Sequence, residues 1–137
     1  MDALMLTLMA WLHFHTGYDV DVQTPNVTIT EVMNLCQLYG VDPAANCEAI
    51  KLKGFYNERQ TIYLYAGFQQ VDRDDQARLL HELVHYLQWH NGEHIDGCWG
   101  VLEAEAYRLQ DQWRVEHGLE KQADPFKLVM LEAACDS

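Results

Sequence analysis

The chain has 137 residues, and 9 Lys and Arg against 21 Asp and Glu give it a formal net charge of −12. Hydrophobic residues make up 49% of the chain, which excludes an intrinsically disordered protein, and the length favours a single domain over residues 1–137. The excess of acid argues against nucleic acid or an anionic membrane surface as the main partner, because both bind clustered Lys and Arg.

The most apolar stretch lies near the N-terminus. It runs from Ala3 to Phe14, which is shorter than the roughly 20 residues that a membrane span needs. Because residue 2 is Asp, the stretch lacks the positive flank of a signal peptide, and we interpret it as a core helix that ends before Gly17. The localisation stays open: periplasmic or secreted if a signal peptide has been removed upstream of Met1, and cytoplasmic otherwise.

The segment that follows is rich in turn and β signals. Val20–Val22 is a candidate strand, Pro25-Asn26 is a candidate turn, and Thr28–Glu31 fits a capping box at the start of a short helix. Residues 50–56 and Thr61–Tyr65 then predict an antiparallel hairpin, since the second run alternates β-branched and aromatic residues. In that strand, Ile62 and Leu64 are expected to face the core.

Three helices are predicted after the hairpin. The first begins after an N-cap at Asp72 and ends near His90, and its apolar residues lie on most sides, which is typical of a buried helix. The second covers Val101 to about Glu116, and the third follows the Asp124-Pro125 pair, with Asp as N-cap and Pro at the first helical position.

The four cysteines show no metal-binding spacing. Cys36, Cys47, Cys98 and Cys135 include no C-x-x-C pair. They allow three disulfide pairings, and the sequence does not choose among these or against free thiols.

The strongest functional signal is the run His81-Glu82-Leu83-Val84-His85 inside the buried helix. Residues four apart lie about 40° apart around a helix and one turn along it, so both imidazoles can bind one metal ion. Glu82 lies about 100° around the helix from His81 and about 60° from His85. It cannot easily be a third ligand on the same ion, but it can reach a water molecule on that ion, which is the geometry of a metal-activated hydrolase.

A catalytic zinc needs a third protein ligand. The next helix offers Glu103 and Glu105, which flank its apolar stripe at similar angles. Spacing alone leaves the choice between them open.

An H-E-x-x-H helix followed by a helix with a Glu resembles the gluzincin branch of the zincin metallopeptidases. The pattern around Glu103, with the small residue Ala106 three positions later, fits Glu103 as the ligand, and 17 residues separate it from His85. The hairpin and this helix, roughly residues 50 to 115, also resemble small uncharacterised bacterial metallopeptidases. The metzincin continuation and the inverted H-x-x-E-H are absent.

The resemblance implies an α+β, minimal zincin-like domain, mostly helical, with a short antiparallel sheet packed on the H-E-x-x-H helix. It implies Zn²⁺ on His81, His85 and Glu103, and hydrolysis of a peptide or protein substrate with Glu82 as general base. The strand Thr61–Tyr65 would edge the cleft and pair with an extended peptide. An N/O site of this kind also accepts cobalt or manganese.

Several residues are open candidates for supporting roles. Tyr107 is the first choice for stabilising the transition-state oxyanion. The alternatives are Tyr86, His90, His94 and His117. Asp96 or Asp111 could hold a histidine tautomer. The four tryptophans, Trp99 among them, are interpreted as core and rim residues. The rival function is a metal-binding regulatory or interaction module with little or no catalysis.

Overall fold

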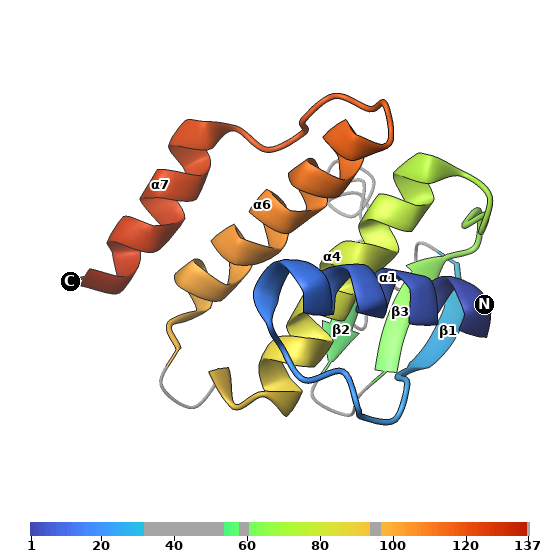
Figure 1. Ribbon diagram of the computed structural model, residues 1–137. Coiled ribbons are helices and arrows are strands. Elements are labelled where there is room, and N and C mark those ends of the chain that lie inside the picture. The colour runs from blue at the N-terminus through green and yellow to red at the C-terminus, as the bar shows by residue number, and fades with distance from the viewer. Residues whose placement is uncertain (32–53, 58–60, 94–96, 137) are drawn as a thin grey trace.

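The computed structural model describes residues 1–31, 54–57, 61–93 and 97–136. The α+β class is confirmed, and helices predominate (Figure 1). The described elements are, in chain order, α1 (Asp2–Thr16), β1 (Asn26–Thr30), β2 (Gly54–Asn57), β3 (Thr61–Tyr65), α4 (Arg73–His90), α6 (Trp99–Glu116), α7 (Pro125–Ala133) and the short 3₁₀ helix η1 (Ala134–Asp136). None of the helices described has the length and apolarity to cross a membrane.

Local signals set the helix ends, as predicted. Gly17 ends α1 in the left-handed conformation, with a φ of 76° and its N–H donated to the carbonyl of His13. Asp72 caps α4 by accepting from the N–H of Asp75 at 3.0 Å, and Asp124 caps α7 by accepting from the N–H of Phe126 at 3.0 Å.

The sheet is mixed, which corrects the predicted purely antiparallel one. Its order is β1-β3-β2: β2 pairs with β3 antiparallel, but β1 pairs with β3 in parallel, with Asn26 opposite Thr61. The prediction that Thr61–Tyr65 edges a cleft is therefore wrong, because β3 is bonded on both sides. Ile62 and Leu64 are fully buried, as predicted.

The segment before β1 also differs from the prediction. Val20–Val22 forms no strand, and Asn26–Thr30 is a strand rather than a turn and a capping box. β-branched residues fill this run, and β3 supplies a partner strand, so extended pairing wins over a local cap. The helix predicted after Thr28–Glu31, and the first residues of the hairpin, lie outside the described residues.

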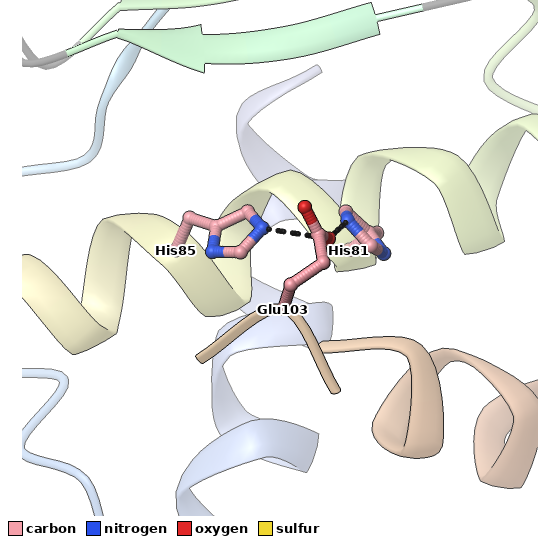
Figure 2. A group of neighbouring side chains, drawn as sticks. All are labelled: His81, His85 and Glu103. Atoms are coloured by element: carbon pink, nitrogen blue, oxygen red, sulfur yellow. Dashed lines mark hydrogen bonds and ion pairs between the residues drawn. The ribbon is translucent and has the colours of Figure 1, made fainter. Parts of the chain in front are cut away.

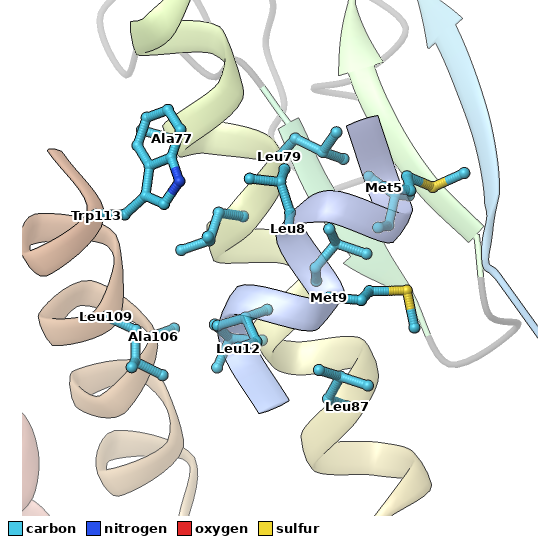
Figure 3. Packing of buried hydrophobic residues seen from close by; sticks show 14 of the residues in the cluster. Met5, Leu8, Met9, Leu12, Ala77, Leu79, Leu87, Ala106, Leu109 and Trp113 are labelled. Carbon is cyan, nitrogen blue, oxygen red and sulfur yellow. The ribbon is translucent and has the colours of Figure 1, made fainter. Parts of the chain in front are cut away.

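The helices form a layer beside the sheet. α7, α6 and α4 lie side by side, and the sheet contacts α4, as Figure 1 shows. α1 crosses α4, and Leu8 and Leu12 of α1 pack towards α4 and α6, where Leu109 is also buried (Figure 3). This packing buries α4 over most of its surface and fixes it against α6, the two helices that carry the predicted site.

One disulfide closes the C-terminal end of the structure. Cys98, the residue before α6, is bonded to Cys135 in η1. Gly100 lies directly beneath this bond, where an added Cβ would come within 2.0 Å of the carbonyl oxygen of Leu131. The start of α6 is thus fastened to the end of α7. Cys36 and Cys47 lie outside the described residues.

Replacing Cys98 and Cys135 together by Ala is expected to lower the free energy of unfolding by about 3–4 kcal/mol, since the bond closes a loop of 37 residues. Ala is preferred to Ser at position 98, because Ser would add an N-cap and mask part of the loss. Urea denaturation without reductant measures the change. A loss below about 1 kcal/mol would show that this bond does not constrain the unfolded chain.

Candidate metal centre

His81 and His85 lie one turn apart on the same buried face of α4. Their exposed fractions are 3% and 7%, and both side chains point towards α6 (Figure 2). Their ring centroids are 5.0 Å apart, and the planes of the two rings are nearly perpendicular. The predicted pairing of the two imidazoles on one helix face is present.

Glu103 of α6 meets both histidines. Its Oε1 lies 2.7 Å from Nε2 of His81 and 3.3 Å from Nε2 of His85 (Figure 2). The three residues each place one possible ligand atom within 4.8 Å of the others. Neighbouring ligands of a tetrahedral zinc ion lie about 3.4 Å apart, so these donors have nearly the spacing that the ion requires.

Glu105 faces another direction. Its carboxylate accepts from Nε2 of Gln88 at 3.1 Å and from the hydroxyl of Tyr18. Desolvation and this contact with Glu105 raise the pKa of Tyr18 above its ordinary value. Of the two glutamates between which spacing does not choose, the structure brings Glu103 to the histidines.

Two glutamines hold the outer nitrogens of the histidines. Nδ1 of His81 lies 2.9 Å from Oε1 of Gln110, and Nδ1 of His85 lies 2.9 Å from Oε1 of Gln88. Each amide oxygen can only accept, so each Nδ1 carries a proton, and Nε2 is the nitrogen that each histidine turns towards Glu103 and would offer to a metal ion. Gln88 is itself fixed, because its Nε2 donates to the carbonyl of Leu102 at 2.9 Å.

Sequence reasoning misses these glutamines and favours Asp96 or Asp111 for this role. Asp111 instead accepts from the backbone N–H of Gln122 and Ala123, and so holds the connection between α6 and α7. Asp96 lies outside the described residues. The sequence does contain a signal for the two glutamines. Gln88 comes seven residues after His81, and Gln110 comes seven residues after Glu103, so each glutamine lies on the same helix face as a predicted ligand.

The charges of the three residues are coupled. Burial by itself lowers the pKa of His85, but its hydrogen bond with Glu103 and the charges of Glu82 and Glu103 raise it above the ordinary value. Burial by itself raises the pKa of Glu103, but its hydrogen bonds with His81 and His85 hold it well below the usual range. A metal ion at this centre would therefore compete with a proton at Nε2 of His85, and its binding should release protons.

Glu82 lies between the two histidines in α4 and is 4% exposed. It is not among the three converging ligands within the described part of the chain, although its charge acts on His85. This placement agrees with the expected position of a general base beside a ligand, and the role itself stays a prediction.

Two aromatic side chains of α6 flank the histidines. Tyr107 packs against His81 with ring centroids 4.6 Å apart, and Trp99 stacks on His85 at 4.9 Å. Trp99 is 60% exposed, and its sequence context indicates only a core or rim residue. It belongs to the surroundings of this centre.

The other candidates lie elsewhere. The hydroxyl of Tyr86 donates to the carbonyl of Gln23, and the ring of His90 packs on Tyr86 at 4.4 Å. His117 stacks on Trp113 and contacts its carbonyl oxygen through Nδ1 at 2.7 Å. His94 lies outside the described residues.

Replacing Gln110 by Leu is expected to weaken zinc binding by about 10- to 100-fold, because His81 would lose the partner that fixes its tautomer and orientation. Gln112, an exposed residue of the same helix, supplies the control, and Gln112→Leu should change the affinity by less than about threefold. Competition with a chromogenic chelator measures both values. Equal affinities in the two variants would show that Gln110 does not support the site.

Comparisons with known proteins give a family and little else. No curated protein and no solved structure matches the chain. Residues 1–137 match the family described as Domain of unknown function (DUF6647), which covers the whole chain. The chain therefore belongs to the DUF6647 family.

Proposed function

We propose that this protein is a zinc-dependent peptidase. The observation that carries the proposal is the convergence of Nε2 of His81, Nε2 of His85 and Oε1 of Glu103, with the buried Glu82 on the same helix. Two histidines and one carboxylate are the ligand set of several catalytic zinc sites, which keep a further position open.

The residues have distinct roles in this proposal. His81, His85 and Glu103 would hold the ion, and Gln110 and Gln88 would fix the tautomers of the two histidines. A zinc ion bound there supplies a Lewis acid that activates water and polarises a carbonyl group. Glu82 accepts the proton of the attacking water and passes it to the leaving amine, which matches its buried place beside the ligands.

The outer edge of β2 is a place near α4 where an extended substrate could form backbone hydrogen bonds with the sheet. Within the described residues β2 is paired only with β3, and β2 packs more extensively on α4 than β3 does. An extended peptide could add to β2 by backbone hydrogen bonds and lie along the metal helix. β2 thus takes the role that the resemblance to gluzincins implied for Thr61–Tyr65.

Digestion of a peptide library by the zinc-loaded protein tests the activity. We expect new peptide termini in mass spectrometry, their loss after treatment with a chelator, and their return when zinc is added back. A protein that holds one zinc ion and produces no cleavage above the chelated control would instead be the metal-binding module considered as the rival.

A further inference from the structure

Three residues of α6 form one stripe against the histidines. Trp99, Glu103 and Tyr107 are spaced by four residues, so they lie on one face of the helix. Trp99 contacts His85, Glu103 contacts both histidines, and Tyr107 contacts His81. Eight residues of helix span about 12 Å, so the two aromatic rings mark opposite ends of the metal centre.

The Tyr107 end carries a positive charge. Nζ of Lys127 lies over the Tyr107 ring, 5.9 Å from its centroid. The two residues share a hollow of about 470 Å³ at the junction of α6 and α7. Its lining consists of Tyr107, Gln122, Ala123, Asp124, Lys127 and Leu128.

Lys127 takes part in none of the salt bridges within the described residues, whereas Arg108 is paired with Glu132 and Arg114 with Asp74. The carboxylate of Asp124 in the same hollow accepts from a backbone N–H to cap α7. In a chain with a net charge of −12, Lys127 is therefore an available cation beside Tyr107, the residue that contacts His81. An anion is the ligand that such a position selects.

The Trp99 end is apolar and open. Trp99 is 60% exposed and Val101 is 43% exposed. An exposed indole held in place by stacking on His85 offers a flat surface for an apolar side chain. The two ends of the centre thus differ in chemistry.

We propose that Lys127 and Tyr107 form a carboxylate-binding subsite and that Trp99 forms an apolar subsite on the opposite side of the metal centre. Substrates would carry a carboxylate on one side of the cleaved bond and an apolar side chain on the other. This inference rests on the proposed peptidase function. The carboxylate can belong to an acidic side chain or to the C-terminus of the substrate.

The first experiment measures binding without turnover. The probes are monohydroxamates of succinic, glutaric and adipic acid, each compared with its neutral amide on the zinc-loaded protein by calorimetry. We expect at least one acid to bind about tenfold more tightly than its amide. Lys127→Met should abolish this preference for the acid, and Lys127→Arg should keep most of it. Lys121 is an exposed lysine outside the hollow, so Lys121→Met should leave the preference unchanged.

The second experiment uses peptides. Matched substrates carry Glu or Gln, and a free or amidated C-terminus, so the pair whose kcat/KM differs identifies the source of the carboxylate. Lys127→Met should remove that difference and leave the preference for Leu over Gly on the other side. Trp99→Ala should reduce the preference for Leu by about tenfold and leave the charge preference.

The outcomes separate the inference from the function on which it rests. Hydroxamates that bind equally well with and without the carboxylate overturn the carboxylate subsite and leave the peptidase proposal standing. A charge preference that depends on Lys127, together with no cleavage of any peptide, supports the subsite and overturns the peptidase. Absence of hydroxamate binding to the zinc-loaded protein overturns the inference. An acid-to-amide affinity ratio that is the same in Lys127→Met and Lys121→Met also overturns it.

Discussion

Replacing Glu103 by Gln is expected to weaken zinc binding by at least about 100-fold. The carboxylate is the only anionic group among the three converging ligands of the described chain, and its Oε1 lies within 3.3 Å of both Nε2 atoms. A neutral amide is a much poorer ligand for zinc and would leave two histidines to hold the ion. Competition with a chelator of known affinity measures the change.

Glu105→Gln is the matched control, because it makes the same chemical change two residues away. Glu105 contacts Gln88 and Tyr18 and not the histidines, and an amide oxygen can still accept from both partners. We expect the zinc affinity of this variant to stay within about threefold of the wild type. A larger loss in Glu105→Gln than in Glu103→Gln would reverse the assignment of the third ligand.

Replacing Glu82 by Gln is expected to lower kcat by about 10²- to 10⁴-fold and to leave zinc bound. Gln keeps the shape of the buried side chain but cannot take a proton from water. The zinc affinity should change little, since Glu82 is outside the set of converging ligands in the described residues. Steady-state hydrolysis of a cleaved peptide and metal analysis of the same sample give both quantities.

Glu120→Gln removes an exposed carboxylate that has no proposed role and should keep wild-type turnover. Unchanged turnover in Glu82→Gln would exclude this residue as the general base. Loss of zinc together with turnover would show that Glu82 supports the metal site instead of the proton transfer.

The helices of this protein can be predicted because their signals are local. The caps at Asp72 and Asp124 and the stop at Gly17 act within a few residues. The helical period by itself is enough to place His81 and His85 on one face. Glu103 needs more, because a helical wheel does not separate it from Glu105, and the resemblance to gluzincins supplies the choice.

The sheet and the supporting groups depend on distant parts of the chain. β1 forms because β3 lies beside it as a parallel partner. The paired residues Asn26 and Thr61 are 35 positions apart in the chain, and no local sequence pattern indicates such a distant pairing. Gln110 and Trp99 acquire their roles only when α6 packs on α4. The sequence shows which residues share a helix face, but tertiary packing determines which other element contacts that face.

The metal content of the protein tests the central claim most directly. We expect protein that is purified without added metal, then titrated with zinc, to bind about one equivalent per chain. Glu103→Gln should fail to reach that value under the same conditions. Less than about 0.2 equivalents in the wild type, with no rise on titration, would contradict a zinc site at His81, His85 and Glu103.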